Sequence, residues 1–175
     1  MSQTFKTEAI VLKKRSLLNK DSIVTFFTQE HGKVRTVAKG IKKITSRRLP
    51  HTQTGNLLNI VIYSRHDHFY LQESYLISGF SEIKKDQAKT NNLYIFLFIL
   101  ERLLPENQPE TPVYNLTKHY LVELSKSKDK LDALLSKYAN QLVKVLGYST
   151  GEKPLFQLFP LIEELIHEKI PSFDI

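Results

Sequence analysis

Seven lysines and arginines lie between residues 31 and 48, a stretch that contains no aspartate or glutamate. Such side chains bind phosphate oxygens, and a protein that neutralises several phosphates binds nucleic acid with an affinity that falls as salt rises. A surface that only keeps a protein soluble usually mixes both signs of charge. We therefore predict that this stretch contacts a nucleic-acid backbone, through Lys33, Arg35, Lys39, Lys42, Lys43, Arg47 and Arg48.

The positive charge of the chain is concentrated in its first half. Residues 1–80 contain 13 Lys or Arg and 5 Asp or Glu, a net +8, whereas residues 81–175 contain 12 and 13, a net −1. A second basic cluster, predicted to reach the same surface, consists of Lys13, Lys14 and Arg15. This asymmetry indicates that one half meets a polyanion while the other packs or binds protein.

Residues suited to catalysis or metal binding are sparse in the basic half. Its carboxylates form no spaced pair of the kind a nuclease needs, and the chain has no glycine-rich phosphate loop or nucleophile elbow. We therefore predict a protein that is not an enzyme and has no cofactor. His66 and His68 would share a face of an extended segment and so chelate a metal, but a polar hairpin turn is the more common use of such residues. The absence of cysteine excludes thiolate metal sites and disulfides.

Residues 1–80 show the alternation of β-strands. Apolar, aromatic and β-branched residues gather at 9–12, 22–29, 33–39, 57–64 and 69–76. Five short strands, with the longest connection between the third and the fourth, predict a closed OB-type barrel, which usually binds single-stranded nucleic acid or oligosaccharide. In the third strand the outward residues should be Lys33, Arg35, Val37 and Lys39, and the inward residues Val34, Thr36 and Ala38.

Four aromatic residues on these strands are open to two interpretations. They serve either as platforms for stacked bases or as core residues of the barrel, and the sequence pattern does not decide between these roles. The four residues are Tyr63, Phe69, Tyr70 and Tyr75.

From residue 81 onward the pattern predicts helices. Residues 92–104 are apolar nearly all round, and amphipathic segments follow at 112–124, 131–146 and 154–170, the last interrupted at Pro160. The fold class is therefore predicted as α+β, with an OB-type barrel at 1–80 and an all-α domain at 81–175. In the last segment, burial is expected for Phe156, Phe159, Ile162 and Leu165.

No segment indicates export or insertion into a membrane. The N-terminus lacks the pattern of a signal peptide, and the longest apolar run, residues 93–100, is far below the roughly 18 residues that span a bilayer. A soluble cytoplasmic protein, without a membrane partner, is the resulting expectation.

The N-terminal segment resembles the start of the RecO family of bacterial recombination mediators. The similarity rests on an acidic residue at Asp21, the turn at 30–33 (EHGK), the segment at 38–40 (AKG) with basic residues after it, and the pair Ser46-Arg47. Further on, residues 144–148 (KVLGY) are similar to the leucine-rich helix of that family that ends in LGY. Two features depart from the family pattern: no four-cysteine zinc module follows, and part of the usual helical domain is expected to be missing or reduced.

The resemblance implies a location in the bacterial cytoplasm or nucleoid, and a set of activities and partners. RecO proteins have an OB domain and a helical domain, bind single- and double-stranded DNA, anneal complementary strands, and act with RecR to load RecA onto DNA coated with single-strand-binding protein. The family docks the acidic, apolar-ended tail of that protein in its helical half. Here the one basic rim available is a row with a spacing of seven, which is otherwise a solvated helix face: Lys130, Lys137 and Lys144.

Two other classes of function compete with this one. A general OB-fold RNA-binding or translation-associated protein would share the basic face, and a protein-binding barrel would use that face for an acidic partner. Association with a RecR-like protein would separate the recombination mediator from both.

Overall fold

The computed structural model describes residues 3–41, 46 and 48–172 of the 175-residue chain, and it divides into two compact units. The first unit comprises Met1–Gly79 with Pro105–Glu110, and the second comprises Phe80–Leu104 with Thr111–Ile175. The short segment 105–110 therefore belongs to the first unit although it lies between two helices of the second. The sequence gives no sign of this, because the segment is polar and carries no strand pattern.

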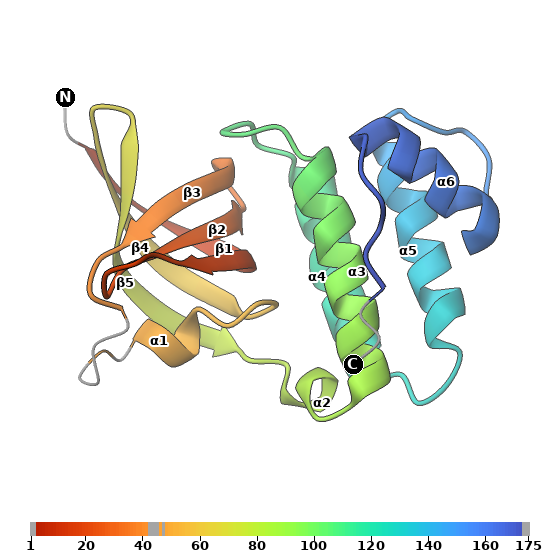
Figure 1. Ribbon diagram of the computed structural model, residues 1–175, viewed down its shortest axis with the longest axis horizontal. Coiled ribbons are helices and arrows are strands. Elements are labelled where there is room, and N and C mark those ends of the chain that lie inside the picture. Colours follow the sequence, from red (N-terminus) through yellow and green to blue (C-terminus); the bar gives the residue numbers. More distant parts are fainter. Residues whose placement is uncertain (1–2, 42–45, 47, 173–175) are drawn as a thin grey trace. The chain divides into compact units, whose positions relative to one another are not determined.

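The first unit is a closed five-stranded barrel with the strand order β1-β2-β3-β5-β4, which confirms the predicted OB-type barrel (Figure 1). All neighbouring strands are antiparallel except β3 and β5, whose parallel pairing of Thr36 with Phe69 and of Val37 with Tyr70 closes the ring. The unit contains the strands β1 (Gln3–Ser16), β2 (Ser22–Thr28), β3 (Gly32–Ala38), β4 (Leu57–Arg65) and β5 (His68–Ser78), and the short helix α1 (Arg48–His51).

The barrel core forms because alternate residues of each strand are apolar and point inward. Val34 and Ala38 of β3 are buried in it, and Thr36 between them is also buried, as the alternation of the third strand predicted. Phe5 and Phe69 are partly buried and pack against one end of this core. Phe69 is thus a core-side residue, whereas its neighbour Tyr70 points to the outside of the barrel.

The turn between β4 and β5 is a two-residue hairpin. His66 and Asp67 both adopt left-handed backbone angles, with φ of 47° and 60°, and this is the conformation that matches the twist of the flanking strands. His66 is therefore not part of an extended segment and does not share a strand face with His68. The turn interpretation of this segment is the correct one.

The segment 105–110 lies against the edge of β3. The Asn107 amide donates to the carbonyl of Lys33 at 2.9 Å, and Gly32 approaches Gln108 so closely that a Cβ built on it would lie 1.9 Å from the Gln108 carbonyl oxygen. Gly32 also has a φ of 69°, which disfavours any residue with a side chain. Glycine is required at this position for both reasons.

The second unit is all helical, as predicted. None of its helices within the described residues is long and apolar enough to cross a membrane. Its centre contains a row of three aromatic rings. The ring centroid of Tyr120 lies 4.2 Å from that of Phe96 and 5.2 Å from that of Tyr138. The helices are α2 (Ser81–Lys84), α3 (Gln87–Leu103), α4 (Thr111–Lys126), α5 (Leu131–Val145) and α6 (Leu155–Ile166).

Two expectations for the last helix are wrong. The helix α6 continues through Pro160, because that residue removes only one hydrogen bond, to the carbonyl of Phe156 at the exposed start of the helix. Phe156 is also exposed instead of buried, since it lies two positions before Leu158 and hence on the opposite side of the helix. Leu158 and Ile162 supply the buried face, so the expected burial of Ile162 is confirmed, whereas Phe159 and Leu165 are only partly buried.

We predict that Gly32→Ala lowers the free energy of unfolding of the barrel by about 3 kcal/mol or more, because the substitution adds a steric clash to the cost of a positive φ. Gly147→Ala is the matched control, since Gly147 has a φ of 81° but no atom within 4 Å of the added Cβ. Its expected cost is about 1 kcal/mol, from the backbone angle alone. Urea denaturation of both variants measures the difference, and equal losses would contradict the close contact with Gln108.

Candidate nucleic-acid interface

The outer face of the barrel carries a continuous row of side chains that crosses all five strands. Register pairs link Arg15 to Ile23, Ile23 to Val37, Val37 to Tyr70 and Tyr70 to Tyr63. Residues paired in register share a face of the sheet, so these five lie side by side on the outside. We call this set the cross-barrel row.

Two loops frame the cross-barrel row. Arg15 lies near the end of β1, directly before the β1–β2 loop, in which Leu18 is fully exposed. Tyr63 and Tyr70 flank the β4–β5 turn at the other side. In OB-type barrels the oligonucleotide or oligosaccharide binds to the face between these two loops.

Three of the predicted phosphate contacts are exposed cations on or next to this face. Lys13 and Arg15 lie on the outer side of β1, and Lys39 follows β3 directly. The Nζ atom of Lys39 lies 4.9 Å from the ring centroid of Tyr70. The structure therefore brings cations from two predicted clusters, residues 13–15 and 33–48, to the same side of the barrel.

Arg35 is exposed on the same face but already has an acidic partner. Its guanidinium lies 2.8 Å from the carboxylate of Glu106, in the segment that packs against β3. An exposed ion pair of this kind is weak and exchanges readily with other partners. Arg35 can still meet a phosphate, at the cost of releasing Glu106. Sequence analysis had no signal for this pair, because 71 residues separate its members.

Two predicted contacts are less accessible than the sequence suggested. Lys33 has an exposed fraction of only 6%, so its location on the outer side of β3 does not make it a surface cation. Lys14 lies on the side of β1 opposite to Lys13 and Arg15, and partial burial lowers the pKa of its ammonium group. The burial of Lys33 and the location of Lys14 on the other side of β1 both disfavour a phosphate contact.

Arg48 has a structural role that its charge alone did not reveal. Its guanidinium donates to the carbonyl of Leu71 on β5 at 2.8 Å and to the carbonyl of Lys39, just after β3, at 2.7 Å. It therefore joins the two strands whose parallel pairing closes the barrel. His51, also on α1, donates from Nδ1 to the carbonyl of Ser74 on β5 at 3.0 Å. The remaining predicted contacts, Lys42, Lys43 and Arg47, lie outside the described residues.

The three lysines of the helical unit do not form a uniform row. Lys130 precedes α5 in a left-handed conformation, so it is not on the helix. Lys137 lies 3.1 Å from Glu123 of α4, and the hydrogen bond from Lys137 is the main reason that the pKa of Glu123 is lowered. Lys144 is exposed near the end of α5. The structure thus leaves Lys130 and Lys144 as the more accessible members.

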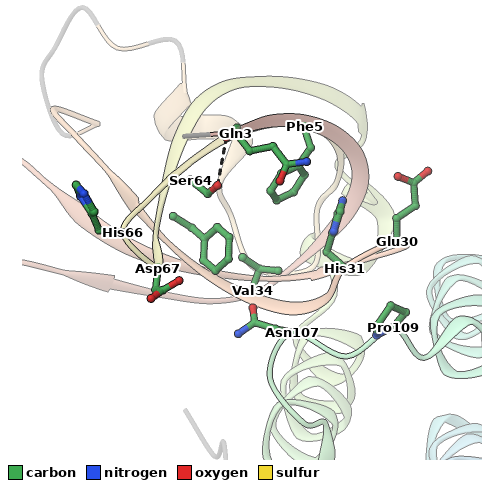
Figure 2. Close-up of a pocket in the computed structure, with 11 residues that line it drawn as sticks. Gln3, Phe5, Glu30, His31, Val34, Ser64, His66, Asp67, Asn107 and Pro109 are labelled. Atoms are coloured by element: carbon green, nitrogen blue, oxygen red, sulfur yellow. Dashed lines mark hydrogen bonds between the residues drawn. The ribbon is translucent and has the colours of Figure 1, made fainter. Parts of the chain in front are cut away.

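A hollow of about 550 Å³ opens at one end of the barrel, beside Phe5 and Phe69 (Figure 2). The ring centroids of Phe5 and His31, on its wall, are 4.0 Å apart. Two carboxylates, those of Glu30 and Asp67, lie on its rim. These carboxylates repel phosphate, and the described residues that line the hollow include no lysine or arginine to offset them, so it is a poorer site for a nucleic-acid backbone than the outer face. No group of three His, Asp or Glu suited to a metal ion occurs in the described part of the chain.

The strand order and the framed cationic face define a small OB-type barrel followed by a helical unit, a class in which oligonucleotide binding is common. Residues 1–80 match the family described as Recombination protein O N terminal. The chain is 34% identical over 143 residues to the DNA repair protein RecO of Caldanaerobacter subterraneus subsp. tengcongensis, a match that covers 82% of this chain and 58% of that protein. It is 31% identical over 149 residues to the DNA repair protein RecO of Listeria welshimeri, covering 85% and 58%. The chain belongs to the RecO family.

The match leaves a substantial part of the relatives uncovered, since the chain spans about 58% of their length. The similarity covers the whole barrel and continues into the helical unit, because 143 matched residues exceed the 80 of the N-terminal family model.

We predict that Arg48→Ala lowers the stability of the barrel by about 2 kcal/mol, because two carbonyls lose a charged donor. Arg48→Lys should lose nearly as much, since an ammonium group lacks the planar fork that reaches both oxygens. The matched control Arg15→Ala, at an exposed position, should change stability by less than about 0.5 kcal/mol. Urea denaturation measures the loss, and hydrogen exchange should place it in β3 and β5. Equal stabilities for the Arg48 and Arg15 variants would show that the bridge contributes nothing.

Proposed function

We propose that this RecO-family chain binds DNA through the outer face of its barrel, with little preference for base sequence, as part of recombinational DNA repair. The observation that carries the proposal is the location of Arg15 and Lys39, two exposed cations, on the face framed by the β1–β2 and β4–β5 loops. Contacts from Lys and Arg to phosphates supply affinity without reading the bases. The proposed role is binding without catalysis.

The wider role follows the family. We propose that the chain anneals complementary strands and acts with a RecR-like protein in loading RecA onto DNA coated with single-strand-binding protein. The support is the RecO resemblance of residues 30–33 and 38–40 together with relatives named DNA repair protein RecO. Annealing fits a surface that neutralises phosphates, since repulsion between the two strands is the main barrier to their approach.

We predict that binding of a single-stranded oligonucleotide weakens with salt. If Lys13, Arg15, Arg35 and Lys39 each neutralise one phosphate, log affinity should fall with log salt at a slope of about −3. The double variant Arg15→Glu, Lys39→Glu should bind more weakly and show a slope smaller in magnitude by about 1.4, because two contacts are lost. Fluorescence anisotropy at several salt concentrations measures both quantities.

A charge-matched control separates local contacts from the effect of net charge. The variant Lys130→Glu, Lys144→Glu also lowers the net charge from +7 by four units, but in the helical unit. It should bind DNA as the unmodified protein does. A slope near zero for the unmodified protein, or equal losses in the two double variants, would contradict binding by the outer face.

The same helical variant tests a proposed partner. We propose that the acidic tail of single-strand-binding protein docks on the helical unit near Lys130 and Lys144, the accessible members of the predicted row. Titration calorimetry with the tail peptide should show binding by the unmodified protein and at least about tenfold weaker binding by Lys130→Glu, Lys144→Glu, because two attractions become repulsions. Unchanged binding by the variant would contradict a docking site near Lys130 and Lys144.

A further inference from the structure

Two tyrosines lie next to each other on the outer face, where β4 and β5 meet at their shared turn. Tyr63 and Tyr70 are register partners, their ring centroids are 6.3 Å apart, and their planes differ by 36°. Both side chains are partly exposed, so neither belongs to the barrel core. We call Tyr63 and Tyr70 the tyrosine pair.

Cations and apolar surface surround the tyrosine pair. Lys39 lies 4.9 Å from the ring centroid of Tyr70, and the cross-barrel row continues from Tyr70 over Val37 and Ile23 to the exposed Arg15. A shallow hollow of about 260 Å³ lies beside this row, lined by Ile23, Val37 and His68 among others. A chain that crosses this face would meet a cation at each end and apolar side chains between.

We propose that the tyrosine pair is a stacking platform for unpaired bases of single-stranded DNA, with Lys39 bound to an adjacent phosphate. The inference rests on the proposed DNA binding and adds to it the part of the nucleotide that the barrel recognises. Aromatic rings beside a positively charged track are the usual means by which a barrel of this kind holds a single strand without regard to sequence.

The geometry determines how bases would be held. A base inserted between two rings needs about 3.5 Å on each side, and 6.3 Å between tilted rings is too little. Each ring therefore offers its outward face to a base. Lys39 covers Tyr70 in the free protein, but one exposed cation–π contact is weaker than base stacking combined with a phosphate contact, so the flexible lysine moves to the phosphate on binding.

The charges near the tyrosine pair favour DNA over a protein partner with basic residues. Asp67 and Glu106 are the carboxylates that line the neighbouring hollow, and Glu106 is paired with Arg35. Arg15 is an exposed cation of the cross-barrel row, and Lys39 is an exposed cation beside Tyr70. These cations attract a phosphate chain along the cross-barrel row. The tyrosine pair favours single-stranded DNA over a duplex, because the bases of a duplex are already stacked on one another.

Three probes of equal length test the proposal: a single-stranded oligothymidine, a strand of the same backbone without bases, and a duplex. Tyr70→Ala and Tyr63→Ala should each bind the oligothymidine about tenfold more weakly, because one stacked base is lost. Both variants should bind the abasic strand and the duplex as the unmodified protein does, which also shows that they are folded. Tyr70→Phe keeps the ring and should keep the affinity.

Tyr75→Ala is the matched control on the same strand. Tyr75 is more exposed, at 54%, but its hydroxyl donates to Glu73 at 2.6 Å, so a carboxylate accompanies this ring. The Tyr75→Ala variant should bind all probes normally. The platform is contradicted if Tyr70→Ala leaves oligothymidine binding unchanged, as it would if a protein occupied these rings, or weakens all three probes equally. Failure of the unmodified protein to bind any probe would instead contradict the proposed DNA binding itself.

Discussion

The parallel pairing of β3 with β5 is the contact on which the arrangement of the outer face depends. Only two register pairs close the barrel at this seam, Thr36 with Phe69 and Val37 with Tyr70. A parallel contact this short has few hydrogen bonds of its own. Arg48 strengthens it from outside by donating to a carbonyl on either side, that of Lys39 and that of Leu71. The short parallel pairing and the guanidinium of Arg48 together hold Lys39 beside Tyr70.

This seam explains why the basic residues of one sequence stretch have different roles. Arg48 stabilises the closure, and Lys33 is nearly buried, whereas Lys39 lies at the surface directly at the seam. Arg35 is balanced by Glu106 from a distant segment of the same unit. Arg48 directs both terminal guanidinium nitrogens at backbone carbonyls, so turning them toward a phosphate would break its bridge between the strands. Charge in the sequence therefore overstates the number of residues that can bind DNA.

Much of the fold was predictable from the sequence, and much of the site was not. The alternation of residues 33–39 indicated correctly which side chains of β3 point inward, because strand periodicity is a local property. The pairing of Arg35 with Glu106 and the bridge made by Arg48 depend on contacts distant in sequence, which no local pattern records. The role of Tyr70 could not be decided either, because a strand with polar and apolar residues on both faces does not show which face is outside.

The most direct test of the account is to map the DNA-binding surface by NMR, following backbone amides during titration with a single-stranded oligonucleotide. Binding by the outer face predicts the largest shifts at Arg15, Val37, Lys39 and Tyr70, with smaller changes in the β1–β2 loop. The hollow beside Phe5 and His31 should change little, because its rim carries two carboxylates and its described lining residues include no lysine or arginine. Shifts centred on that hollow, or confined to the helical unit, would contradict the claim that the outer face of the barrel binds DNA.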